Sequence, residues 1–128
     1  MLETMLMCLA LNVYFEARSD TMEGQYAVAH VVMNRVQSNR FPSDVCSVVM
    51  QHRKGRTCQF SWYCDGKSDR PKDAYAIAYA TMVAADVLRG EAADMTGGAT
   101  HYHANYVRPY WASELEHTVT IGSHLFYK

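Results

Sequence analysis

The residues from Ser19 to about Ser38 constrain the fold most, because they predict a helix that is apolar on nearly every side. Asp20 can serve as its N-cap, and Glu23 then falls at the third helical position, as in a capping box. The apolar residues that follow cover most of the helix circumference: Ala27, Val28, Ala29, Val31, Val32, Met33 and Val36. A helix of this kind lies at the centre of a domain, with other elements packed around it.

Another helix is predicted to precede this one in the chain, and it ends in a carboxylate on its apolar side. Its apolar residues recur at helical spacing: Leu2, Met5, Leu6, Leu9 and Val13. Glu16 continues this stripe. A buried carboxylate must be paired, hydrogen-bonded or protonated, and desolvation raises its pKa, as a general acid at neutral pH requires. Alternatively, Glu16 lies at a fraying helix end and pairs with Arg18 or another surface cation.

Two more helices and a small sheet are predicted downstream. Ser43 or Asp44 can cap a short third helix, and an alanine-rich fourth helix runs from Pro71 in its first turn to Gly90 as its terminator. Residues 99–103 alternate as a strand does, and residues 118–127 are typical of two strands joined by a turn at Gly122. We therefore predict one α+β domain over residues 1–128, mainly helical, with a small antiparallel β-sheet formed from the C-terminal third.

Residues 52–70 are polar and irregular. They contain a run that combines hydrogen-bonding groups with flat apolar faces, Gln59, Phe60, Ser61, Trp62 and Tyr63. Such a mixture suits a sugar ring or another flat polar ligand, although the segment can also be a plain surface loop.

The four cysteines leave the covalent structure open. Cys8 falls within the first helix and is typical of a small buried apolar residue. Cys58 and Cys64 can close a short disulfide in an oxidising compartment, with Cys46 as a competing partner for either. A structural zinc site is the alternative, but the spacing of Cys58 and Cys64 does not match the close cysteine pairs of such sites.

Composition limits the partners. The 128 residues carry a net charge of -1, so no strong overall field favours nucleic acid or an anionic membrane. We expect no nucleic acid partner, no membrane insertion and a monomer. The N-terminus lacks the basic start and small-residue cleavage site of a signal peptide. We therefore expect either a protein released from a host cytoplasm by a separate factor or a secreted protein trimmed of its export signal.

Several ordered segments together resemble the cell wall hydrolase family of SleB and CwlJ type, the spore-cortex-lytic enzymes and their phage and bacterial relatives. They span nearly the whole chain: Tyr14–Arg18, Glu23–Gln25, Ala27–Ala29, Asn34–Val36, Cys58–Ser61, Asp65–Gly66, Thr100–His103, Tyr106–Pro109, Trp111, Ile121–Gly122, His124 and Phe126–Tyr127. The resemblance implies a lysozyme-like catalytic domain that cleaves the β-1,4 glycan of peptidoglycan beside N-acetylmuramic acid. It also implies that Glu16 is the catalytic glutamate.

The resemblance further implies two groups of substrate-binding residues. Gln59, Phe60 and Ser61 would bind acetamido and hydroxyl groups, while His101, Tyr102, His103 and Tyr106 would orient the sugar and shield Glu16 from water. Strand alternation places Tyr102 opposite His101 and His103, so at most one of these sets lines the cleft. No metal or other cofactor is expected.

We expect lytic transglycosylation with Glu16 as the single acid and base, because the substrate's own 6-hydroxyl replaces a second carboxylate. A hydrolytic muramidase would instead need a partner carboxylate to activate water. The candidates are Asp20, Glu23, Asp65, Asp69 and Glu114, of which Asp20 and Glu23 are typical helix caps. Two rivals are a zinc-dependent amidase or peptidase using His101, His103 and either His124 or Glu16, and a glycan-binding module without catalysis.

Overall fold

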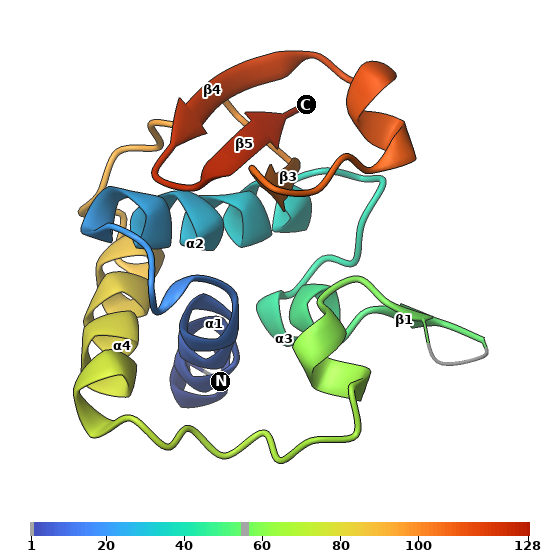
Figure 1. Ribbon diagram of the computed structural model, residues 1–128. Coiled ribbons are helices and arrows are strands. Elements are labelled where there is room, and N and C mark those ends of the chain that lie inside the picture. Colours follow the sequence, from blue (N-terminus) through green and yellow to red (C-terminus); the bar gives the residue numbers. More distant parts are fainter. Residues whose placement is uncertain (1, 55–56) are drawn as a thin grey trace.

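Figure 1 shows the computed structural model of the chain, which describes residues 2–54 and 57–128. The helices are α1 (Leu2–Ala17), α2 (Met22–Val36), α3 (Val45–Val49) and α4 (Ala74–Leu88), with short 3₁₀ helices η1 (Ser61–Cys64) and η2 (Tyr110–Ser113). The strands are β1 (His52–Arg53), β2 (Thr57–Cys58), β3 (His101–Ala104), β4 (His117–Ile121) and β5 (His124–Tyr127). None of the helices described here is long and apolar enough to cross a membrane.

Helix α2 lies between two layers, as its all-round apolar surface predicts. On one side, Ala29 and Val32 join a core formed with α1, α3 and α4. On the other side, Ala27 and Val31 pack against Phe126 of the sheet. Figure 1 shows the sheet and the other helices on opposite sides of α2. The predicted central helix is therefore confirmed.

The predicted cap of α2 is wrong. Thr21 is the N-cap, and its hydroxyl accepts a hydrogen bond from the Gly24 N–H at 3.0 Å. The Asp20 carboxylate instead turns towards Ser123 and His124, at the far end of the chain. The helix thus starts one residue later than predicted, and Glu23 does not occupy the third helical position of a capping box.

Helix α1 anchors the segment that follows β2. The Trp62 indole N–H donates to Asn12 Oδ1 at 2.8 Å, and both residues are buried. Phe15 stacks on Trp62 with a ring separation of 4.8 Å. This segment is therefore not a plain surface loop, because Phe60 and Trp62 belong to the core, whereas Tyr63 is exposed.

The C-terminal third forms an antiparallel sheet of order β3-β5-β4, as predicted. Tyr102 is paired with Phe126, and Ala104 with His124, so these four side chains share the face towards α2. His101 and His103 lie on the opposite face. The two-residue strands β1 and β2 form a separate small hairpin that the irregular sequence of this region does not predict.

Helix α4 begins later than its proline suggests. Asp73 is the N-cap and accepts a hydrogen bond from the Ala76 N–H at 3.0 Å, so Pro71 precedes the helix. The left-handed Gly90, with a φ of 73°, follows the end of the helix and confirms the predicted terminator. Ala80 and Ala84 are fully buried, and α4 packs along α1.

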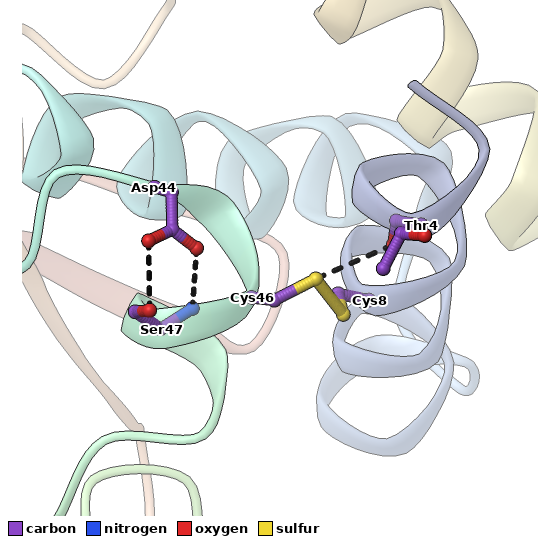
Figure 2. The surroundings of a disulfide bond; sticks show 5 residues. All are labelled: Thr4, Cys8, Asp44, Cys46 and Ser47. Atoms are coloured by element: carbon purple, nitrogen blue, oxygen red, sulfur yellow. Dashed lines mark hydrogen bonds between the residues drawn. A yellow bond between two sulfur atoms is a disulfide. The ribbon is translucent and has the colours of Figure 1, made fainter. Parts of the chain in front are cut away.

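The disulfides are Cys8–Cys46 and Cys58–Cys64. The short Cys58–Cys64 pairing is confirmed, whereas the assignment of Cys8 as a plain apolar residue is wrong. Figure 2 shows the reason: α3, which starts at its N-cap Asp44, brings Cys46 against Cys8 of α1. With these cysteines paired, a zinc site at Cys58 and Cys64 is excluded.

The two disulfides should contribute unequally to stability. Loop-closure entropy predicts a loss of about 4 kcal/mol for Cys8→Ser with Cys46→Ser, and about 2 kcal/mol for Cys58→Ser with Cys64→Ser. The difference arises because the first bond joins cysteines 38 positions apart and the second joins cysteines 6 apart. Urea unfolding at neutral pH of both double variants measures this order, and equal losses would contradict it.

Candidate active site

Glu16 lies in the last turn of α1, where two hollows meet. We call the first the loop hollow; it is lined by Tyr14, Phe15, Glu16, Arg18, Ser61, Trp62, Asp65, Lys67, Ser68, Arg70 and Lys72. We call the second the sheet hollow; it is lined by Phe15, Glu16, Ala17, Arg18, Ser19, Asp20, Ala104, Tyr106, Ser123 and His124. Their volumes are about 520 and 300 Å³. A single extended ligand that occupied both hollows would pass directly over the Glu16 carboxyl group.

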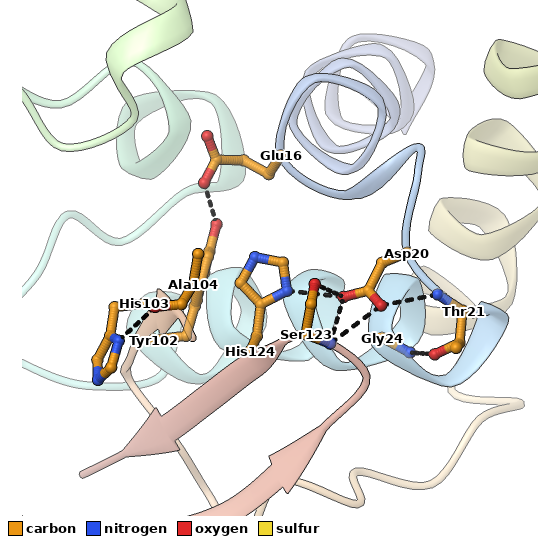
Figure 3. Close-up of polar contacts among 9 residues, drawn as sticks. All are labelled: Glu16, Asp20, Thr21, Gly24, Tyr102, His103, Ala104, Ser123 and His124. Atoms are coloured by element: carbon orange, nitrogen blue, oxygen red, sulfur yellow. Dashed lines mark hydrogen bonds and ion pairs between the residues drawn. The ribbon is translucent and has the colours of Figure 1, made fainter. Parts of the chain in front are cut away.

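The Glu16 carboxyl group is held by Tyr102 of β3. The Tyr102 hydroxyl donates a hydrogen bond to Glu16 Oε1, and Figure 3 shows the other carboxyl oxygen directed away from Tyr102. Burial raises the pKa of Glu16; the hydrogen bond from Tyr102 and the charges of His124 and Arg35 oppose this shift without cancelling it. Burial, together with the neighbouring Glu16, raises the pKa of Tyr102 well above its ordinary value, so the phenol stays a donor.

Arg35 places a buried positive charge near this pair. Its Nε donates to the Thr100 carbonyl oxygen at 2.7 Å, and its guanidinium lies over the rings of Phe41 and Phe60, at 4.8 and 5.3 Å from their centroids. Phe60 in turn stacks near Tyr102, with a centroid separation of 6.4 Å. Arg35 thus keeps a fixed charge behind Tyr102 that favours the ionised form of Glu16.

A second carboxylate, Asp20, lies in the sheet hollow with its side chain 5% exposed. It accepts hydrogen bonds from the Thr21 N–H at 2.8 Å, from the Ser123 hydroxyl at 3.2 Å and from His124 Nδ1 at 2.7 Å. Figure 3 shows His124 lying between Asp20 and the Tyr102–Glu16 pair. Burial alone would raise the pKa of Asp20, but the hydrogen bonds from His124, Thr21 and Ser123 lower it from its ordinary value.

Two glycines make room for Asp20. A Cβ atom on Gly24 would lie 2.7 Å from Asp20 Cγ, and one on Gly122 would lie 2.2 Å from Asp20 Oδ1. Gly122 also has a φ of 59°, a left-handed conformation. Sequence analysis names Asp20 as a helix cap and as a candidate second carboxylate, but it misses the contact with Ser123 and His124. No local sequence pattern signals this contact, because Gly122, Ser123 and His124 approach Asp20 only in the folded chain.

Four of the predicted substrate-binding residues gather near Glu16. Tyr102 contacts it directly, and Phe60 packs behind Tyr102. Ser61 lines the loop hollow, and the highly exposed Tyr106 lines the sheet hollow. Gln59 is exposed and lines neither hollow; its backbone N–H donates to the Gln51 carbonyl oxygen at 3.0 Å.

His101 and His103 do not reach Glu16, because they occupy the other face of β3. His103 Nδ1 donates to the Ala104 carbonyl oxygen and Nε2 accepts from the Tyr127 hydroxyl, both at 2.8 Å. His101 packs on Trp111, and burial, with the charges of Arg35 and Arg40, lowers its pKa to about 4. Of the two strand faces, the one that carries Tyr102 adjoins Glu16.

This arrangement also separates the proposed zinc ligands. His124 shares a sheet face with Tyr102, so it cannot join His101 and His103 on one metal ion. Within residues 2–54 and 57–128, no group of three or more histidine, cysteine, aspartate or glutamate side chains is placed to hold a metal. Of the other candidate carboxylates, Asp65 lines the loop hollow, whereas Glu23, Asp69 and Glu114 line neither hollow.

Comparison with known proteins identifies the family. A family model described as Cell Wall Hydrolase matches residues 19–127. The chain belongs to the cell wall hydrolase family. The predicted resemblance is thereby confirmed, although the matched range of this family begins just beyond Glu16 and does not include it.

Curated relatives of this cell wall hydrolase are spore cortex-lytic enzymes. The one from Halalkalibacterium halodurans is 32% identical over 119 residues, which cover 92% of this chain and 33% of that protein. The one from Oceanobacillus iheyensis is 30% identical over 126 residues, covering 94% and 40%. The chain therefore spans between a third and two-fifths of the length of these two relatives.

Solved structures match nearly the whole cell wall hydrolase chain. The catalytic domain of the germination-specific lytic transglycosylase SleB from Bacillus anthracis has a TM-score of 0.79 and 29% identity, covering 98% of this chain and 95% of that one. The catalytic domain of the Bacillus cereus SleB protein has the same TM-score and identity, covering 98% and 91%. The predicted lysozyme-like α+β fold is confirmed by this match.

Replacing Tyr102 should change the proton affinity of Glu16. In Tyr102→Phe the hydrogen bond that favours the carboxylate is lost, so the pKa of Glu16 should rise further above its ordinary value. A ¹³C NMR titration of the glutamate carboxyl carbons measures this. Tyr106→Phe removes a hydroxyl that lines the sheet hollow and should leave the Glu16 titration unchanged; an unchanged or lowered pKa in Tyr102→Phe would contradict the assignment.

Because Gly122 lies so close to Asp20, a side chain added at this glycine should lower the stability of the protein. Gly122→Ala combines a left-handed backbone, costing about 1–2 kcal/mol, with a clash at Asp20 that costs about 1–3 kcal/mol more. Gly66→Ala is the matched control, since Gly66 has a φ of 77° but nothing within 4 Å of its Cβ position. Thermal unfolding of both variants should show the larger loss for Gly122→Ala, and equal losses would disprove the close contact.

Proposed function

We propose that this chain is a lytic transglycosylase that cleaves the β-1,4 bond between N-acetylmuramic acid and N-acetylglucosamine in peptidoglycan. The observation that carries the proposal is Glu16: a half-buried carboxyl group with a raised pKa, at the junction of two hollows. A carboxyl group in such a position can remain protonated near neutral pH while bound substrate lies over it. Membership of the cell wall hydrolase family and the likeness to SleB catalytic domains support the same reaction.

In the proposed mechanism Glu16 acts first as acid and then as base. Protonated Glu16 gives its proton to the glycosidic oxygen, the bond from that oxygen to C1 of the muramyl ring breaks, and an oxocarbenium-like centre develops at C1. The 6-hydroxyl of the same sugar then attacks C1, and its proton passes to the Glu16 carboxylate. The products are a 1,6-anhydromuramyl end and a free 4-hydroxyl, and Glu16 is again protonated.

Tyr102 suits both halves of this cycle. It binds Glu16 Oε1 and leaves the second carboxyl oxygen free to carry the proton. While Glu16 is ionised, the Tyr102 hydroxyl, the charge of Arg35 and the charge of His124 all stabilise the carboxylate. These groups oppose the effect of burial and stabilise the ionised form, which benefits a residue that must exchange its proton twice in each turnover.

A hydrolytic muramidase is the second candidate, because Asp20 and Asp65 each share a hollow with Glu16. Asp20 is poorly suited to activate water. Its pKa is lowered from the ordinary value, and both of its carboxyl oxygens already accept hydrogen bonds from Ser123. Asp65 is exposed, and its Oδ1 accepts the Lys67 N–H at 2.9 Å. Transglycosylation needs neither residue.

The proposal places the enzyme's action at the cell wall, with glycan strands of peptidoglycan as its partner. Neither proposed step requires a metal or an organic cofactor, since the proton donor and the nucleophile are Glu16 and the substrate's own hydroxyl. A zinc amidase would cleave the peptide instead of the glycan. The chemical nature of the new ends therefore separates these reactions.

Glu16→Gln should abolish glycan cleavage, lowering the rate by about 10²–10⁴-fold, because the amide cannot donate the proton. Digestion of purified peptidoglycan followed by mass spectrometry of the soluble products measures this, and anhydromuramyl ends should appear with the wild type and not with Glu16→Gln. Glu114→Gln is the matched control, since Glu114 is exposed and lines neither hollow. Reducing muramic ends would instead identify a hydrolase, and cleaved peptide on intact glycan would reject both glycosidase mechanisms.

A further inference from the structure

The loop hollow contains an unusual concentration of positive charge. Four of its lining residues are basic: Arg18, Lys67, Arg70 and Lys72. The acidic groups among the lining residues are Glu16, whose raised pKa favours its neutral form, and Asp65. Because the whole chain has a net charge of -1, this hollow differs in sign from the molecule around it.

These charges are available to a ligand. Within the part of the chain that the structure describes, the ion pairs are those of Arg89 and His124, so none of the four basic side chains is matched with a carboxylate. Arg18 lies over the Tyr14 ring, at 4.8 Å from its centroid, which leaves its charge unneutralised. An anion in the hollow would therefore not have to displace an existing partner.

Hydrogen bonds order the backbone that carries three of these residues. The Lys67 N–H donates to Asp65 Oδ1 at 2.9 Å, and the Arg70 N–H donates to Ser68 Oγ at 3.2 Å. Beyond them, the Tyr14 hydroxyl of α1 accepts the Lys72 N–H and the Asp73 N–H, each at 3.1 Å. The Lys72 end of the segment is thus tied to the same helix that carries Glu16, which keeps these residues beside the acid.

The sugar rings of the glycan are uncharged and do not require such cations. Phe15 and Trp62 also line this hollow and already offer apolar surface to a sugar. Positive charges beside them fit an anionic group that is attached to the glycan close to the bond over Glu16. In peptidoglycan, the peptide stem on the lactyl group of muramic acid carries free carboxylates at that position.

We infer that Arg18, Lys67, Arg70 and Lys72 bind carboxylates of the peptide stem, and that the enzyme therefore prefers strands whose muramic acid carries charged stems. This inference rests on the proposed function. An anionic polymer linked through the 6-oxygen of muramic acid is a poorer fit, because that oxygen must be free to attack C1. The stem, linked through the 3-oxygen, leaves the nucleophile available.

The test compares two substrates that differ in charge alone. Peptidoglycan freed of secondary polymers by acid is divided, and in one half the stem carboxylates are converted to amides with carbodiimide and ammonia. Release of anhydromuramyl ends at limiting substrate gives kcat/KM for each. For the wild type at low ionic strength, amidation should lower kcat/KM about 10-fold, because several exposed and individually weak charge pairs are lost together. The difference should shrink as salt is raised.

The variant Lys67→Gln with Arg70→Gln and Lys72→Gln should lose the same factor on native peptidoglycan and little more on the amidated form. Arg18 is left unchanged because it adjoins Glu16. The matched control, Arg53→Gln with Lys54→Gln and Arg108→Gln, removes equal charge from exposed residues that line neither hollow and should retain the wild-type preference. Circular dichroism verifies that both variants are folded.

Two results would overturn the inference: wild-type kcat/KM values that are equal on the two substrates at every salt concentration, or losses in the triple variant that are equal on both substrates. Failure of the proposed function would be seen separately. In that case the wild type would release no anhydromuramyl ends from either substrate, or Glu16→Gln would release them as fast as the wild type does.

Discussion

The hydrogen bond from the Tyr102 hydroxyl to Glu16 joins residues 86 positions apart and depends on the whole arrangement of the domain. Glu16 belongs to α1, which packs in the helical layer, and Tyr102 belongs to β3, in the sheet on the other side of α2. The two side chains meet only because α2 is apolar on both sides and holds the two layers together. Burial of this contact is also what raises the pKa of Glu16, so the packing and the increased proton affinity of Glu16 have one physical origin.

A second polar connection, through Asp20, fixes the same two layers at the turn between α1 and α2. Its carboxylate binds Ser123 and His124 at the start of β5, and Gly24 and Gly122 leave room for it. Asp20 and Glu16 therefore have opposite electrostatic environments a few residues apart in the chain. Hydrogen-bond donors outweigh burial at Asp20 and keep it anionic, whereas burial outweighs the single donor at Glu16 and favours the proton. This division lets Asp20 serve the structure and leaves Glu16 suited to the proposed proton transfer.

Much of this structure follows from local sequence. The parts that do not follow from it have one cause in common, which is contact between residues far apart in the chain. Apolar spacing predicts α1, α2 and the C-terminal strands, and the stripe through Leu9 and Val13 correctly directs Glu16 inwards, because periodicity reports burial directly. The Cys8–Cys46 bond is not predictable, since it depends on α3 meeting α1. The role of Asp20 is missed because its partners lie at the other end of the chain. Strand alternation separates Tyr102 from His101 and His103, but it does not say which face adjoins the acid.

The basic residues of the loop hollow and the raised pKa of Glu16 are compatible because of where each charge lies. A positive charge near a carboxyl group lowers its pKa, and four unpaired cations would oppose the protonated state that a general acid needs. Lys67, Arg70 and Lys72 are exposed, however, and water screens their fields over short distances. The cations that do act on Glu16 are His124 and the buried Arg35. Water thus screens Glu16 from the cations that suit an anionic ligand, and the effect of burial on the pKa of Glu16 persists.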